Sequence, residues 1–305
     1  MMSNMTNLFN YEPNTDPDVR LIKHTGRYEQ YIVSFPPVCN IPDESNNALH
    51  GEYLRPYGDN LPQAILVHGL GDRSVIPMKF LARELAGQGI ASFIIYLVTH
   101  SSRTLSVGHP LSDDEWFENY RTSVIDIRHV LDWMETRDEL AKGKTGIVGL
   151  SFGGFISAIA MGIDHRINSG VLIISGGNLE KIGMRSRVLP RKWGFHRSEA
   201  EFNTQQQRYR QYLDEVVEKG WEQVIPPERS FLVDALTYAH YIRSRPLLMI
   251  NARWDEIIPK EATLDFWESA GRPPITWFPS GHASIWLGYP FISRKIKRFF
   301  RSSLG

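Results

Sequence analysis

Short apolar runs alternate with helical patterns along most of the chain. Near-continuous apolar runs at residues 64–67, 90–98, 144–150, 171–175 and 246–251 predict strands that are buried on both faces. Such strands belong to parallel sheets covered by helices. Further strands are predicted at residues 28–35, 48–54 and 275–278. The pattern therefore predicts an α/β fold with a mostly parallel sheet and helices on both faces.

Apolar residues at steps of three and four mark the helices between these strands. The clearest stripe runs from Trp116 to Met134, and Ser112 with Glu115 has the spacing of a capping box at its start. A similar stripe over residues 292–300 predicts a C-terminal helix.

A long segment of about 70 residues separates the predicted strands at 171–175 and 246–251, too many for a simple crossover. Ser198 and Glu201 form a second capping box, which predicts a helix over residues 198–219. Another helix is predicted at about residues 230–243. We interpret this segment as a helical cap inserted over one edge of the sheet.

These patterns divide the chain into a core with additions. The first 18 residues are polar, and we expect them to be poorly ordered. The predicted organisation is an N-terminal extension with a strand at 1–45, a core at 46–177 and 246–305, and the cap at 178–245.

Composition narrows the possible functions. The chain has 305 residues, and 34 basic residues balance 34 acidic ones, which argues against a broad nucleic-acid-binding surface. Its single cysteine, Cys39, excludes an intramolecular disulfide framework and a thiolate metal cluster. No apolar stretch approaches the ~20 residues of a membrane span, and no secretion-signal pattern begins the sequence. We therefore expect a soluble, cytoplasmic protein without an integral membrane segment.

The strongest chemical motif is G-L-S-F-G at residues 149–153, followed by Gly154. It lies between the predicted strand 145–150 and a helical pattern at 155–162. A serine on a sharp strand-to-helix turn takes a strained backbone conformation, and small neighbours are needed to avoid collisions. Ser151 is therefore the candidate nucleophile.

A serine hydroxyl needs a general base, itself oriented by an acid. Three histidines lie well downstream of Ser151: His196, His240 and His282. His282 follows the predicted strand 275–278 in a glycine-containing turn, which can present its imidazole freely. The other two fall in the predicted cap and are expected to be surface or packing residues.

The best candidate for the acid is Asp255, just after the predicted strand 246–251. Its neighbour Glu256 is the obvious rival. An alternative acid position after the preceding strand holds Gly-Gly-Asn at residues 176–178, with Glu180 beyond. Asp255 is therefore preferred.

Acyl transfer also requires two backbone N–H donors for a developing oxyanion. One is expected from Phe152, the residue after the nucleophile, and the other from Leu70, which has a glycine on each side. His68 precedes this loop at the end of the predicted strand 64–67. We expect His68 to shape the loop by hydrogen bonding and not to act as a catalyst.

Four motifs agree in type, order and spacing: H-G-x-G, G-x-S-x-G, D-x-x-[VI]-P and G-H. From about residue 45 to its end, the chain resembles the α/β-hydrolase superfamily, nearest to its esterase, lipase and dienelactone-hydrolase-like branches. The serine departs from the aspartate of the dehalogenase branch. The missing second glycine after His-Gly disfavours bulky tertiary-alcohol esters. The resemblance implies that Ser151 is the nucleophile, His282 the general base and then acid, and Asp255 the acid that orients it. It also implies that the amides of Leu70 and Phe152 are the two oxyanion donors.

The leading interpretation is a serine esterase acting on a small-molecule carboxylic ester through an acyl-enzyme, without metal or organic cofactor. A peptidase or amidase, or a thioesterase, would use the same residues. A binding module with a degraded site is a third possibility, which the intact triad disfavours. Oligomeric state cannot be determined from the sequence.

One charged cluster remains outside this scheme. Five basic residues line the predicted C-terminal helix: Arg294, Lys295, Lys297, Arg298 and Arg301. They suggest an anionic surface partner, but we interpret them as a solvated helix face.

Overall fold

The computed structural model describes residues 8–13, 16–36, 48–103, 111–190 and 197–305. Cys39 lies outside these ranges. One sheet of nine strands has the order β1-β2-β3-β5-β4-β6-β7-β8-β9. The strands are β1 Asp18–His24, β2 Tyr28–Ser34, β3 His50–Pro56, β4 Leu61–Val67, β5 Ala91–Ile95, β6 Leu140–Leu150, β7 Ser169–Ile173, β8 Leu247–Ala252 and β9 Ile275–Phe278.

In this spatial order, all neighbouring strands from β5 to β9 are parallel. The β1–β2, β2–β3 and β3–β5 pairs are antiparallel. The predicted α/β fold with a mostly parallel sheet is confirmed. Strand β1 was not predicted, because all seven of its residues are exposed. An edge strand with both faces in solvent carries no apolar alternation for a pattern to detect.

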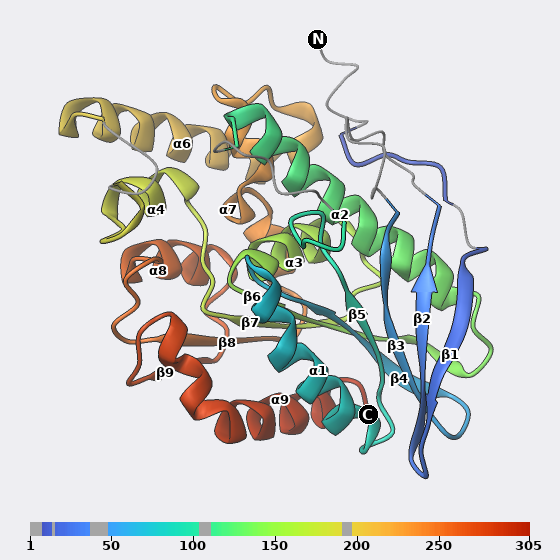
Figure 1. Ribbon diagram of the computed structural model, residues 1–305. Coiled ribbons are helices and arrows are strands. Elements are labelled where there is room, and N and C mark those ends of the chain that lie inside the picture. The colour runs from blue at the N-terminus through green and yellow to red at the C-terminus, as the bar shows by residue number, and fades with distance from the viewer. Residues whose placement is uncertain (1–7, 14–15, 37–47, 104–110, 191–196) are drawn as a thin grey trace.

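Helices cover both faces of the sheet (Figure 1). Helices α1 and α9 pack on one face of the sheet, and α2 and α3 pack on the other. Each face has its own apolar core. The α-helices are α1 Val75–Ala86, α2 Asp113–Glu135, α3 Phe152–Ile163, α4 Leu179–Arg185, α6 Glu199–Lys219, α7 Ala235–Tyr238, α8 Lys260–Ser269 and α9 Tyr289–Ser303. The 3-10 turns are η2 Asp72–Ser74, η3 Trp221–Gln223, η4 Arg229–Val233, η5 Ala239–Ile242 and η6 Ala283–Gly288. Within the described ranges, no helix combines the length and apolarity needed to cross a bilayer.

Both predicted capping boxes are confirmed. Ser112 caps α2 and accepts from the Glu115 amide, while the Glu115 carboxylate accepts from the Ser112 amide. Ser198 and Glu201 form the same reciprocal pair at the start of α6. These local bonds satisfy amides that the first helical turn leaves free.

The continuous helix expected over residues 230–243 is wrong. The chain forms three short pieces there, η4, α7 and η5, and Asp234 adopts an extended backbone between η4 and α7. Its buried carboxylate accepts hydrogen bonds from the amides of Asn178 at 2.8 Å, Leu179 at 2.6 Å and Leu236 at 2.9 Å. Hydrogen bonds from this carboxylate to the amides of a distant segment therefore interrupt the predicted helix.

The expectation of poor order in the first 18 residues is wrong for residues 8 and 9. Leu8 and Phe9 are buried, and the Phe9 ring packs against Trp221 and Tyr238. Arg121 donates a hydrogen bond to the Leu8 carbonyl at 2.7 Å. These two residues thus fasten the N-terminal segment to α2 and to the segment between β7 and β8.

Candidate active site

Ser151 lies at the tight turn from β6 into α3. Its φ of 50° and ψ of −115° are rare for a residue with a side chain. The Ser151 amide donates to the Ile173 carbonyl at 2.8 Å, which anchors the turn to β7. Strain of this kind is typical of functional positions held by their surroundings.

Close packing around the serine turn requires glycine at positions 149, 153 and 154. A Cβ on Gly149 would lie 2.4 Å from the Gly153 carbonyl oxygen, and one on Gly153 would lie 2.3 Å from that of His68. A Cβ on Gly154 would approach the Ser175 Cβ to 2.6 Å. Helix α3 can therefore start directly against β4 and β7 only because these side chains are absent.

Ser151, His282 and Asp255 meet although they are far apart in the sequence. The Ser151 Oγ lies 2.9 Å from His282 Nε2, and His282 Nδ1 lies 2.9 Å from each Asp255 carboxylate oxygen. The serine follows β6, the aspartate follows β8 and the histidine follows β9. The carboxyl ends of these parallel strands lie at one edge of the sheet, which brings the three side chains together.

The loop after β8 holds Asp255 in place. One carboxylate oxygen accepts from the amides of Ile257 at 2.9 Å and Ile258 at 2.8 Å. The Trp254 amide donates to the Ser280 carbonyl at 3.0 Å, which ties this loop to the one that carries His282. The aspartate and the imidazole are therefore positioned by backbone contacts on both sides.

Glu256 contacts the same histidine in a different way. One of its carboxylate oxygens accepts from the backbone amide of His282 at 2.9 Å. A Cβ on Gly281 would lie 2.7 Å from that oxygen, so glycine leaves room for the contact. Asp255 thus contacts the imidazole of His282, whereas Glu256 contacts the backbone of the loop that carries it.

The other residues considered from sequence lie elsewhere. Asn178 is a buried N-cap of α4 whose side-chain amide donates to Gln206 at 2.7 Å. Glu180 lies 3.4 Å from Arg197, and burial raises the pKa of its carboxyl group. His240 follows α7 in η5, and His196 lies outside the described residues.

The loop after β4 lies against the serine turn. A Cβ on Gly69 would be 3.3 Å from the Ser151 Cβ, so its backbone passes beside the nucleophile candidate. Phe152 is the first residue of α3, where an amide has no partner within the helix. The Leu70 amide finds no acceptor among the described residues, and its side chain is 44% exposed. The loop that carries Leu70 thus passes beside Ser151 at Gly69, and Phe152 follows Ser151 directly.

His68 shapes this loop, as expected. Its Nδ1 lies 2.6 Å from the Gly69 carbonyl, and its Nε2 accepts from the Leu97 amide at 3.1 Å. An accepting Nε2 requires a neutral ring with the proton on Nδ1. Burial lowers the pKa of His68 to about 4, because the charged imidazolium would lose its hydration.

Acidification is therefore expected to destabilise the protein through His68. The unfolded chain takes up this proton below its reference pKa of about 6.5, whereas the folded chain does so only below about 4. The contribution to the free energy of unfolding is retained above pH 6.5 and lost as the pH falls toward 4. It amounts to about 2 kcal/mol between pH 7 and pH 5.

Urea unfolding of the wild type and of His68→Gln at pH 7 and pH 5 measures this contribution. The variant should lose about 2 kcal/mol less than the wild type over this interval, because the linked proton is gone. His165→Gln, at an exposed histidine, is the matched control and should follow the wild type. Parallel behaviour of the wild type and His68→Gln would contradict the assignment.

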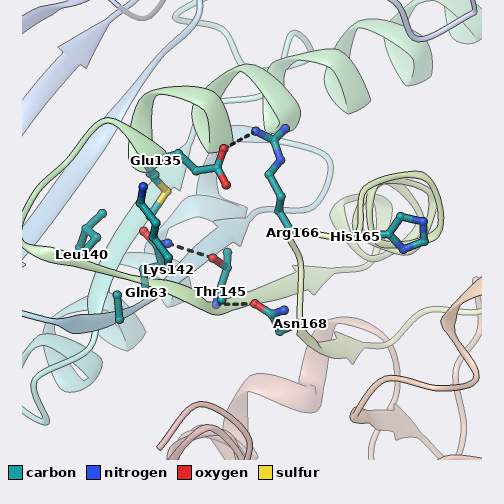
Figure 2. A pocket seen from close by; sticks show the side chains of 11 residues that line it. Gln63, Glu135, Leu140, Lys142, Thr145, His165, Arg166 and Asn168 are labelled. Carbon is teal, nitrogen blue, oxygen red and sulfur yellow. Dashed lines mark hydrogen bonds and ion pairs between the residues drawn. The ribbon is translucent and has the colours of Figure 1, made fainter.

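Two pockets differ in their relation to this site. One, of about 270 Å³, lies at the amino ends of β4 and β6, where Gln63 donates to Thr145 at 2.9 Å (Figure 2). Ser151 follows the opposite end of β6, so this pocket is remote from it. The other, of about 540 Å³, adjoins the site through Asp255 and Glu256.

The sheet order and the serine turn place the protein in the class of helix-covered α/β proteins with a strained serine at a strand-to-helix turn. The chain belongs to the alpha/beta hydrolase family, whose model matches residues 64–294. The match begins in β4 and ends in α9, and it spans Ser151, Asp255 and His282.

Among curated proteins, the chain is 23% identical over 189 residues to Uncharacterized protein Rv2627c of Mycobacterium tuberculosis. This match covers 60% of the chain and 37% of the relative. The chain thus spans little more than a third of that relative's length.

Solved structures with the same fold include an acetyl xylan esterase from Paenibacillus sp. R4, at 18% identity and a TM-score of 0.71. That match covers 99% of this chain and 93% of the esterase. A Pyrococcus horikoshii acylaminoacyl peptidase matches at 16% identity and a TM-score of 0.62, over 91% of this chain and 42% of the peptidase. A cold-adapted esterase from an Arctic intertidal metagenomic library matches at 16% identity and 0.56, over 94% and 98% of the two chains.

Proposed function

We propose that this protein is a serine hydrolase that cleaves carboxylic esters through an acyl-enzyme. The observation that carries the proposal is the continuous contact from Ser151 Oγ through the His282 imidazole to Asp255, with 2.9 Å at each step. A serine hydroxyl becomes a nucleophile when an oriented base accepts its proton.

In the acylation step, Ser151 Oγ attacks the ester carbonyl carbon while its proton passes to His282 Nε2. The carbonyl oxygen becomes an oxyanion and accepts hydrogen bonds from the amides of Leu70 and Phe152. Collapse of this intermediate breaks the bond to the alkoxy oxygen. The alcohol leaves with the proton that His282 received, and the acyl group remains on Ser151.

In the deacylation step, His282 Nε2 accepts a proton from water, and the resulting hydroxide attacks the acyl carbon. The same two amides stabilise the second oxyanion. Ser151 leaves with the proton from His282, and the carboxylic acid is released. The two steps together consume one ester and one water molecule and return Ser151 and His282 to their starting protonation states.

Asp255 has two tasks in this mechanism. Its contact with Nδ1 holds the proton there, so that Nε2 presents a lone pair to Ser151. Its negative charge also stabilises the imidazolium that forms in each step. Only 6% of its side chain is exposed, so water screens this charge little.

The names of the structural relatives agree with this proposal at the level of acyl transfer. Two are esterases and one is an acylaminoacyl peptidase. Amide and thioester hydrolysis would use the same residues, so the leaving group must be identified by experiment.

A fluorophosphonate probe tests the proposal directly, because it labels an activated serine. We expect stoichiometric labelling of the wild type at the peptide that contains Ser151. We also expect turnover of p-nitrophenyl esters between acetate and palmitate, with matched anilide and thioester substrates cleaved more slowly. Absence of both labelling and turnover would contradict the proposed activity, and preferred cleavage of an anilide or thioester would reassign the substrate class.

A further inference from the structure

The C-terminal segment concentrates positive charge in a chain with no net charge. Residues 283–305 contain five Lys or Arg residues and no Asp or Glu. Helix α9 buries Ile292, Ile296 and Phe300 against the sheet. The exposed residues Phe291, Arg294, Lys295 and Arg298 share its other face, since they follow one another at helical spacing.

Most of these cations have no carboxylate partner. Lys297 forms an ion pair with Glu84 of α1. Within the described part of the chain, Arg294, Lys295 and Arg298 form no ion pair, and the Arg301 guanidinium donates only to the Gln88 side-chain oxygen, at 3.5 Å. The outer face of α9 therefore presents uncompensated positive charge to solvent.

Large apolar side chains are exposed beside this charge. Leu287 is 87% exposed and Phe291 63%, while Phe80 and Ile76 of α1 are 52% and 49% exposed. The Phe80 ring lies 6.2 Å from that of Tyr289, which connects the α1 residues to the start of α9. Helices α1 and α9 lie side by side on this face of the sheet (Figure 1).

We propose that this basic–apolar face, formed by Ile76, Phe80, Leu287, Phe291, Arg294, Lys295 and Arg298, docks on the surface of an anionic phospholipid bilayer. Phe291 and Leu287 would enter the boundary between head groups and acyl chains. The three cations, at the level of the head groups, would attract the anionic lipids.

The composition of the face favours a bilayer over other partners. A symmetric dimer through this face would place two sets of unpaired cations opposite each other, which repel. A nucleic acid would account for the cations but offers no apolar phase for Leu287. An anionic bilayer satisfies both features at once.

The face lies next to the candidate active site in sequence. Its 3-10 turn η6 starts at Ala283, directly after His282, and Leu287 lies within it. A docked chain would therefore hold His282 near the bilayer. A lipid-borne ester as substrate rests on the proposed function, whereas the docking itself does not.

Vesicle co-sedimentation tests the docking. The full chain is mixed with vesicles of phosphatidylglycerol and phosphatidylcholine, or of phosphatidylcholine alone. We expect wild-type binding to the anionic vesicles only, weakened strongly by 0.5 M salt, because the electrostatic attraction is screened. Ser151→Ala should bind like the wild type, which separates this result from that of any activity assay.

Two sets of variants separate the contribution of the cations to binding from that of the apolar side chains. Reversing Arg294, Lys295 and Arg298 to glutamate should lower binding at least ~100-fold, since each cation contributes about five-fold or more. Leu287→Ser with Phe291→Ser should lower it roughly 10-fold or more. The matched control reverses Arg20, Lys23 and Lys142, which are exposed and unpaired among the described residues.

The control variant should bind like the wild type. Its net charge changes by the same amount as in the α9 triple variant, but at positions outside the basic–apolar face. Unchanged thermal unfolding of each variant verifies the fold. The proposal is overturned if the wild type fails to bind anionic vesicles or binds neutral ones equally well. It is also overturned if both triple variants lose binding to the same extent, since net charge alone would then explain the attraction.

Discussion

Replacing Ser151 with alanine is expected to lower kcat for an ester substrate by at least about 10⁴-fold. The hydroxyl oxygen is the group that forms the acyl-enzyme, and nothing in alanine can replace it. The residual rate would come from the amides of Leu70 and Phe152, which still stabilise an oxyanion formed by attack of water. The measurement is steady-state hydrolysis of a p-nitrophenyl ester, together with loss of fluorophosphonate labelling.

Ser302→Ala serves as the control for this substitution. Ser302 lies at the end of α9 and is exposed, and among the described residues its hydroxyl bonds only the Phe299 carbonyl. The control should keep the full rate, and both variants should unfold at the wild-type temperature. Wild-type turnover by Ser151→Ala would eliminate Ser151 as the nucleophile.

Asp255→Asn is expected to lower kcat by about 10³–10⁴-fold with little change in KM. Asparagine has nearly the same shape, but its NH₂ group can donate to Nδ1 of His282. The proton of the neutral ring would then lie on Nε2, which could no longer accept a proton from Ser151. The imidazolium would also lose its stabilising charge.

Glu256→Gln is the matched comparison, because Glu256 contacts the backbone amide of the same histidine at 2.9 Å. Glutamine keeps a carbonyl oxygen that can accept from this amide. We expect a loss of less than about 10-fold, since the position of the loop changes but the imidazole keeps its acid partner. A larger loss in Glu256→Gln than in Asp255→Asn would reverse the roles assigned to the two carboxylates.

Much of the fold was predictable because its signals are local. The strands buried on both faces carry continuous apolar runs, and β9 begins and ends at the predicted residues. The capping boxes of α2 and α6 require only residues three positions apart. The elbow at Ser151 was recognisable for a related reason, since its glycines and its flanking strand and helix lie within a single short stretch.

Other features depend on contacts between distant segments. Strand β1 exists because β2 pairs with it, and its exposed residues show no pattern. Asp234 divides a predicted helix because two amides about 55 residues away need its carboxylate. The residues of either segment alone do not reveal these partners.

By itself, the sequence determined the fold class, most of the strands, the helix caps and the order of the candidate site residues. Tertiary structure alone showed that Glu256, the neighbour of Asp255, contacts the backbone of His282 while Asp255 contacts its imidazole. It also decided that the basic helix α9 presents Phe291 with its cations and lies beside exposed residues of α1. The physical reason is that apolar periodicity and capping arise from neighbours in sequence. The partner of a polar group, and the exposure of an apolar one, depend on what folding brings next to it.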